Sequence, residues 1–234
     1  MFEVRTEKTL TVEKVRAAIA GACAALALIA TCAVATADDS QVNLPACQTV
    51  GGQVAADLST TQQSLATDPH WWVTDPTSAT FQPGHTTLSA WTALPNNWVQ
   101  PSAPTASATN PEPVGDYTYT LTFFIPCNNK NYKKLQIEGD ASADNSILSI
   151  SANGHASVAS CVTGTCFNTL THFVIPQADL VGGLNTLTIV VHNDDLYSGL
   201  AVSAALSAMC GKKCCLTLAI GKGKSGDCPD CNSP

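Results

Sequence analysis

The cysteines near the C-terminus have a spacing that could bind a metal ion or form disulfides. Cys210 is followed by Cys214, Cys215, Cys228 and Cys231, in the pattern Cys-x3-Cys-Cys-x12-Cys-x2-Cys. Paired thiolates at such spacings can complete the tetrahedral coordination of zinc. In an oxidising compartment the same residues form disulfides. Cys228-Pro-Asp-Cys231 also has the C-x-x-C form of a redox centre. Such centres sit at a helix N-terminus that lowers the thiol pKa, whereas this motif lies in a Gly/Ser-rich tail. We therefore expect disulfides here.

The body of the chain adds further cysteines. Cys161 and Cys166 bracket a glycine-containing turn and are expected to close their own loop. Cys47 and Cys210 stand near the two ends of the expected domain, where edge strands could bring them together. The disulfide candidates are Cys47, Cys127, Cys161, Cys166, Cys210, Cys214, Cys215, Cys228 and Cys231. Because nine is odd, one thiol must stay free, bind something or pair with a second chain, and the connectivity does not follow from the sequence.

All four tryptophans, Trp71, Trp72, Trp91 and Trp98, lie in one short segment. Exposed indole rings can stack on the apolar faces of sugars, while buried ones fill a core. The core interpretation is favoured for most of them, and all four are kept as candidate ligand-binding residues whose rings would stack on sugar. Trp71 and Trp72 are adjacent, so on an extended strand they face opposite ways, one inward and one outward.

Acidic and amide side chains gather at Asp140, Asp144, Asn145 and Asn153. Their oxygens could bond sugar hydroxyls or bind Ca²⁺, which takes six to eight oxygen ligands and would be a structural ion here. The same residue types also form turns and cap strands, and Asn153-Gly154 is a type I′ hairpin signal. We favour the structural role, and keep Asp144 and Asn145 as candidate ligand-binding residues.

No pattern of an enzyme stands out. The sequence contains no Gly-x-Ser-x-Gly, His-Glu-x-x-His or phosphate-binding loop. Glu112 and Glu138 are the only glutamates after residue 37, and the histidines are scattered at His70, His85, His155, His172 and His192. We expect a protein without catalytic activity and without a cofactor, with a structural Ca²⁺ as the one candidate ion.

Residues 1–37 have the form of a secretory signal peptide. Lys14 and Arg16 precede an apolar run from Ala17 to Ala35, and Ala35-Thr36-Ala37 resembles a cleavage site. A retained membrane anchor, or a lipoprotein modified at Cys32, are the alternatives. Cleavage would leave 7 basic and 15 acidic residues, a balance that argues against nucleic acid and anionic membranes as partners. We expect a secreted or cell-surface protein with no membrane insertion after cleavage.

Alternating apolar and polar residues between turn signals predict a succession of short strands. They are expected at 54–58, 116–125, 132–138, 147–152, 156–159, 169–175, 184–191 and 199–208, with one helical turn at 177–180. Such a succession predicts an all-β protein, an antiparallel β-sandwich of jelly-roll type, over residues 38–209, followed by a Cys-rich tail at 210–234.

Several of these segments resemble the galactose-binding-domain-like jelly rolls, in particular an exported bacterial group. The resemblance rests on Tyr117–Ile125, Ile137–Gly139, Ala143–Asn145, Ile150–Gly154, Phe173, Gly183–Leu187, Val191–Asn193 and Gly199–Leu200, with Asp68–Trp71 and Trp98–Val99. It covers about residues 68–205. It implies a sugar-binding module, found alone or appended to glycoside hydrolases, and assigns no binding residue. We expect carbohydrate binding at a loop end. The alternative is a structural or assembly protein of the cell surface, forming disulfide-linked oligomers through the tail.

Overall fold

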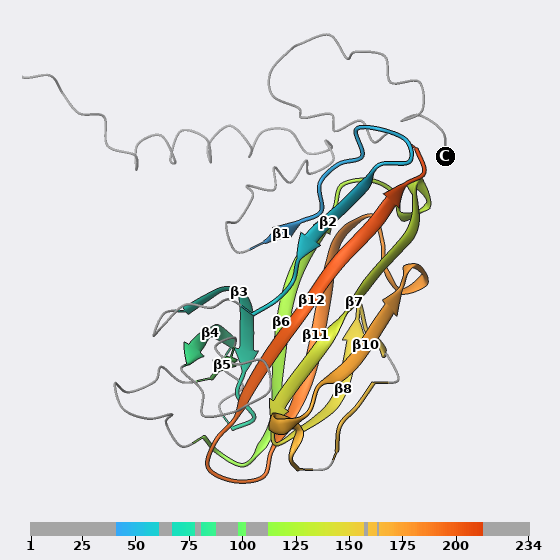
Figure 1. The fold of residues 1–234 in the computed structure, drawn as a ribbon. Helices are drawn as coiled ribbons and strands as arrows, with labels where there is room; N and C mark the ends of the chain where they lie inside the picture. Colours follow the sequence, from blue (N-terminus) through green and yellow to red (C-terminus); the bar gives the residue numbers. More distant parts are fainter. Residues whose placement is uncertain are drawn as a thin grey trace, which may run out of the picture. The chain divides into compact units, whose positions relative to one another are not determined.

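The computed structural model describes residues 41–60, 67–77, 81–87, 98–101, 112–156, 159–162 and 164–212 (Figure 1). All of them belong to the unit Asp38–Pro234. The expected signal peptide, Trp91 and the cysteines beyond Cys210 lie outside these residues. Within the described part of the chain, no helix is long and apolar enough to cross a membrane.

Strands make up nearly all of the regular structure. They are β1 (Val42–Asn43), β2 (Gln53–Asp57), β3 (Thr67–Thr74), β4 (Phe81–Thr87), β5 (Trp98–Gln100), β6 (Gly115–Ile125), β7 (Tyr132–Asp144), β8 (Ser146–Ala152), β9 (His155–Ala156), β10 (Thr171–Pro176), β11 (Gly183–Asn193) and β12 (Gly199–Cys210). Three single-turn 3-10 helices join them: η1 (Asn129–Asn131), η2 (Cys166–Asn168) and η3 (Gln177–Asp179). The helical turn expected at 177–180 is therefore confirmed.

The strands form two layers with the core between them (Figure 1). Layer A contains β10, β7, β12 and β2, and layer B contains β8, β11, β6 and β3. From β6 onward the chain alternates between the layers: β6, β8 and β11 lie in layer B, and β7, β10 and β12 lie in layer A. Pairing is antiparallel, except that β1 runs parallel to β6. The antiparallel β-sandwich of jelly-roll type predicted from the sequence is confirmed.

Alternation along β6 and β11 decides which side chains fill the core. In β6 the aromatic and aliphatic residues at odd positions from Tyr117 to Ile125 are buried, and the threonines between them face outward. β11 repeats the pattern with Leu187, Ile189 and Val191 buried. Burial of such side chains stabilises the fold by about 1.5–3 kcal/mol each relative to leaving them exposed.

A short bridge of strands joins the two layers along one edge. β3 pairs with β6 of layer B, β4 pairs with β3 and β5, and β5 pairs with β12 of layer A. Trp71 of β3 and Trp98 of β5 are completely buried there. The Trp71 Nε1–H donates to the carbonyl of Leu58 at 3.1 Å, so its polar edge is satisfied inside the core.

Strand β7 is longer than expected. A strand ending at Glu138 was predicted because Asp140, Asp144 and Asn145 are turn formers; this prediction is wrong, since β7 continues to Asp144. Ala141 and Ala143 are buried opposite Val202 and Leu200 of β12. The burial available along β12 outweighs the local turn preference of the aspartates.

Two disulfides agree with the pairs expected from the sequence. Cys47 and Cys210 are bonded with their Cα atoms 5.5 Å apart, and Cys161 and Cys166 with theirs 6.0 Å apart. Cys127 is also disulfide-bonded. Disulfides persist in oxidising compartments, so this bonding indicates an environment outside the cytosol.

Candidate functional site

The loop end where β7 meets β8 holds Asp144 and Asn145, the two predicted polar binding residues. Both are buried, and the peptide bond between them is cis. Asn145 is used by the fold: its N–H donates to the carbonyl of His192 at 3.0 Å, and its Oδ1 accepts from the N–H of Asp194 at 2.7 Å. Asn145 therefore fixes the β7–β8 turn to the end of β11, and the structural role favoured from the sequence fits these contacts.

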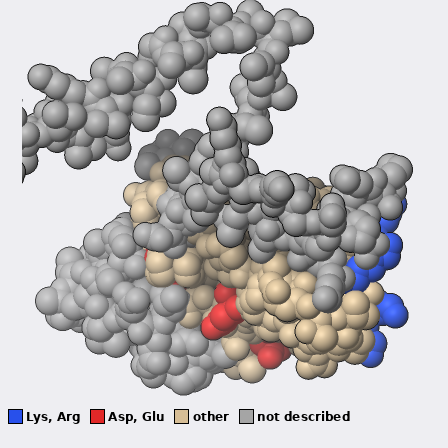
Figure 2. All heavy atoms as spheres, turned by 90° about the horizontal axis from the view of Figure 1, so that it is seen from above, with Lys and Arg blue, Asp and Glu red and all other residues tan. Residues whose placement is uncertain are grey.

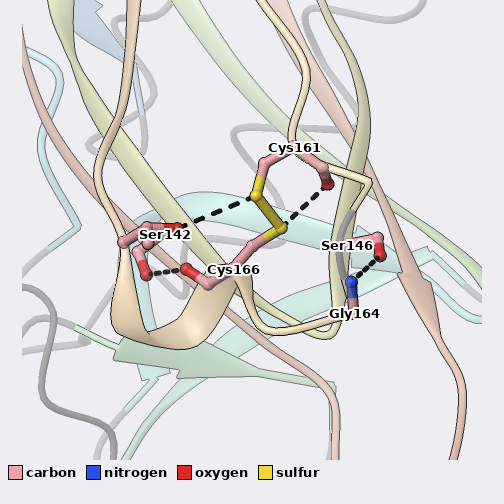
Figure 3. The surroundings of a disulfide bond; sticks show 6 residues. Ser142, Ser146, Cys161, Gly164 and Cys166 are labelled. Atoms are coloured by element: carbon pink, nitrogen blue, oxygen red, sulfur yellow. Dashed lines mark hydrogen bonds between the residues drawn. A yellow bond between two sulfur atoms is a disulfide. The ribbon is translucent and has the colours of Figure 1, made fainter.

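The short disulfide loop covers the same turn (Figure 3). The N–H of Cys166 donates to the carbonyl of Asn145 at 3.0 Å, and the Ser142 hydroxyl donates to the carbonyl of Cys166 at 2.6 Å. On the other side of the loop, the N–H of Gly164 donates to the Ser146 hydroxyl at 3.2 Å. The disulfide between Cys161 and Cys166 thus holds a loop that packs on the turn rather than one that opens a cleft beside it.

Carboxylates collect at this end around His192. Its Nδ1 contacts Asp116, which lies directly opposite it on β6, and its Nε2 is 3.2 Å from Asp194. Among the described residues, no group of three or more His, Cys, Asp or Glu side chains is arranged to hold a metal ion. The lysines of the described residues lie elsewhere. Lys130, Lys133, Lys134 and Lys212 belong to the opposite end, where β7 begins and β12 ends, and Figure 2 shows Lys side chains grouped on one side of that view.

Two buried tyrosines complete the polar interior of the loop end. The Tyr117 hydroxyl donates to the carbonyl of Pro113 at 2.8 Å. Burial raises the pKa of both Tyr117 and Tyr119, and the carboxylate of Glu112 adds to both shifts. The two phenols therefore stay protonated at neutral pH. The Ser198 hydroxyl lies close enough to Tyr119 to oppose its shift, yet the two oxygens do not meet in hydrogen-bond geometry.

The tryptophans divide between the core and the surface. Trp71 and Trp98 are buried, so neither ring offers a face to a ligand, and the surface role expected for them is not supported. Trp72 is partly exposed on the outer side of β3. The expectation that one of the adjacent pair faces inward and the other outward is confirmed.

Trp72 stacks on Phe81, and we call this pair the aromatic platform. The ring centroids are 5.0 Å apart and the ring planes differ by 12°. The pairing of β3 with β4 explains the contact: Trp72 lies opposite Pro83, and Thr74 lies opposite Phe81, so the two rings are diagonal neighbours on one face. The Phe81 side is open, with 56% of the residue exposed. A stacked aromatic pair open to solvent is the feature of the described surface best suited to hold a ligand.

The sequence did not single out Phe81 as a binding residue. It stands in a short segment broken by Pro83 and Gly84 that carries only a weak strand signal. Its position beside Trp72 depends on the register between β3 and β4, which shifts between Thr67 and Trp72. One sequence feature could have indicated the direction of the Phe81 side chain. Phe81 and Pro83 are two residues apart, so both side chains lie on the same side of an extended strand.

Two shallow hollows lie away from the aromatic platform. One, of about 520 Å³, lies over β2, β7 and β12 and is lined in part by Gln53, Lys134 and Met209. The other, of about 600 Å³, lies at the turn after β6, beside Pro126 and Gly182. Both are open to solvent, and neither contains a predicted ligand-binding residue.

Comparison with known proteins gives little. No protein-family model and no curated protein matches the chain. Among solved structures, an isomalto-dextranase of Arthrobacter globiformis T6, complexed with panose, matches with 14% identity over 70% of this chain and 36% of that one, with a TM-score of 0.29. The chain thus spans about a third of that protein's length, and a superposition of this quality supports no inference.

Proposed function

We propose that this protein is a non-catalytic carbohydrate-binding domain that holds neutral sugars on the aromatic platform. The observation that carries the proposal is the stacked Trp72–Phe81 pair, open to solvent on the Phe81 side. Aromatic rings exposed at a surface bind partners that can cover them, and the C–H face of a sugar ring is flat and apolar enough to do so. Binding then lies on the face of layer B, rather than at the loop end expected from the sequence.

The surroundings of the platform favour a ligand without charge. Thr74 and Thr120 lie next to Trp72 on the same face, and Pro83 lies opposite it. Threonine hydroxyls both donate and accept hydrogen bonds, as sugar hydroxyls do. The galactose-binding-like assignment and export after cleavage near Ala37 are parts of the same proposal, and the disulfides support export.

The proposal is tested by affinity electrophoresis of the wild-type protein and the variant Trp72→Ala. Native gels contain dextran, laminarin, xyloglucan or galactomannan, and a matched variant, Leu184→Ala, removes an exposed apolar side chain elsewhere on layer B. We expect at least one polysaccharide to retard the wild type and Leu184→Ala but not Trp72→Ala. Retardation by none of them, together with disulfide-linked oligomers on non-reducing gels, would instead support the structural or assembly role.

A further inference from the structure

The outer face of layer B carries a regular array of hydroxyl groups beside the aromatic platform. We call this array the hydroxyl face. The three threonines of β6 point outward at every second position, and β11 and β8 continue the array. Its members are Thr74, Thr118, Thr120, Thr122, Ser149, Ser151, Thr186 and Thr188, all of them half-buried.

Strand register places these residues in rows that cross the strands. Thr120 lies opposite both Trp72 and Thr188, and Thr188 lies opposite Ser151. A second row runs beside it through Thr74, Thr118, Val190 and Ser149, where Val190 interrupts the hydroxyl groups. Because neighbouring strands are about 4.8 Å apart, the row from Trp72 to Ser151 is about 14 Å long. The aromatic platform stands at one end of both rows.

The two outer faces of the sandwich differ in charge. Layer A exposes Glu138 and Asp140 on β7 and His172 on β10, which contacts both carboxylates. The two rows that cross layer B, Trp72 to Ser151 and Thr74 to Ser149, contain no charged side chain, and the charged pair Asp116 with His192 lies in the next row beyond Thr118. Threonine is common on solvent-facing strands. Solvent exposure alone does not explain why these two rows lack the charged side chains that the outer face of layer A carries.

We propose that the hydroxyl face binds an extended neutral glycan chain that lies across the strands. One sugar ring stacks on the aromatic platform, and the following sugars exchange hydrogen bonds with Thr120, Thr188 and Ser151. A single chain fits better than a flat crystalline surface, because adjacent strands rotate by about 20–25° and a sheet of four strands is therefore twisted. This inference rests on the proposed function and adds the class of ligand: a chain of several sugars rather than a terminal one.

Chain-length dependence separates this inference from simple stacking. Oligosaccharides of two to six units, prepared from whichever polysaccharide retards the wild type, are titrated by calorimetry into three proteins. These are the wild type, the double variant Thr120→Val with Thr188→Val, and a control, Ser203→Ala with Ser207→Ala, which removes two hydroxyls from the outer side of β12. Thermal melts check that all three are folded.

We expect wild-type affinity to rise about tenfold from two units to four, since each added hydrogen bond contributes modestly. The control should match the wild type, while the threonine variant should bind two units more weakly than the wild type, because the second sugar lies over Thr120, and should lose most of the rise. Affinity independent of chain length, or an unchanged threonine variant, would overturn this inference and leave the proposed function standing. Binding confined to insoluble crystalline polysaccharide would overturn it too. Absence of any binding would overturn both.

Discussion

The Asn153 side chain donates a hydrogen bond from Nδ2 to Oδ1 of Asn185 at 2.8 Å, joining the β8–β9 hairpin to the start of β11. Asn153 has φ +52° and Gly154 φ +82°, the left-handed pair that a type I′ turn requires. Asn185 is buried, and its Nδ2 also donates to the carbonyls of Val181 and Gly183. Two asparagines thus fix the geometry of the layer that carries the hydroxyl face.

Replacing Asn185 should destabilise the protein. Asn185→Ala removes the acceptor for Asn153 and Val181 and leaves the part-buried backbone groups of Val181 and Gly183 without their partner. We expect a loss of about 1–3 kcal/mol in the free energy of unfolding, measured by urea denaturation. Asn43→Ala is a suitable control, since that exposed side chain makes one local hydrogen bond and its loss should cost less than about 0.5 kcal/mol. Equal effects from the two variants would contradict the role assigned to Asn185.

The two disulfides should contribute unequally to stability. Their sequence separations are 163 residues for Cys47–Cys210 and 5 for Cys161–Cys166. In the chain-entropy description, the longer loop gives about 5 kcal/mol and the shorter about 2 kcal/mol. We expect the Cys47→Ser, Cys210→Ser double variant to melt well below the Cys161→Ser, Cys166→Ser variant. Calorimetric melts in the opposite order would show that the short loop holds more of the structure than its contacts indicate.

Alkaline solution should destabilise the fold through its buried tyrosines. Burial raises the pKa of Tyr132 from 10.0 to about 12, and it raises those of Tyr117 and Tyr119 as well. The unfolded chain loses these protons near pH 10 while the folded chain keeps them, so stability is unaffected below pH 10 and falls as the pH rises toward 12. Urea midpoints measured between pH 8 and 11.5 should show this decline, and Tyr132→Phe should make it shallower. A decline of the same slope in Tyr132→Phe would exclude Tyr132 as a contributor.

Much of the frame could be predicted from the sequence, because its signals are local. The alternation in Tyr117–Ile125, the Asn153-Gly154 turn and the six-residue Cys161–Cys166 loop each depend on residues close together in the chain. The Cys47–Cys210 disulfide could be predicted because the two cysteines stand near the ends of the domain, where edge strands can meet. These features appear in the structure as expected.

The surface of the candidate site could not be predicted in the same way. Whether Trp71 or Trp72 faces outward depends on how β3 pairs with β6, and the contact with Phe81 depends on a shifted register with β4. The hydroxyl face requires β6, β11 and β8 to lie side by side, although β7 and β10 intervene in the chain. Such pairings are non-local, and no turn motif encodes them.

If Trp72 and Phe81 form one sugar-binding surface, a double-mutant cycle will show that the two side chains depend on each other. Affinities for the retarding polysaccharide are measured for the wild type, Trp72→Ala, Phe81→Ala and the double variant. If the rings act as one platform, each single variant should weaken binding about tenfold or more, and the double variant should be little worse than either. Single variants that bind as tightly as the wild type would contradict the claim.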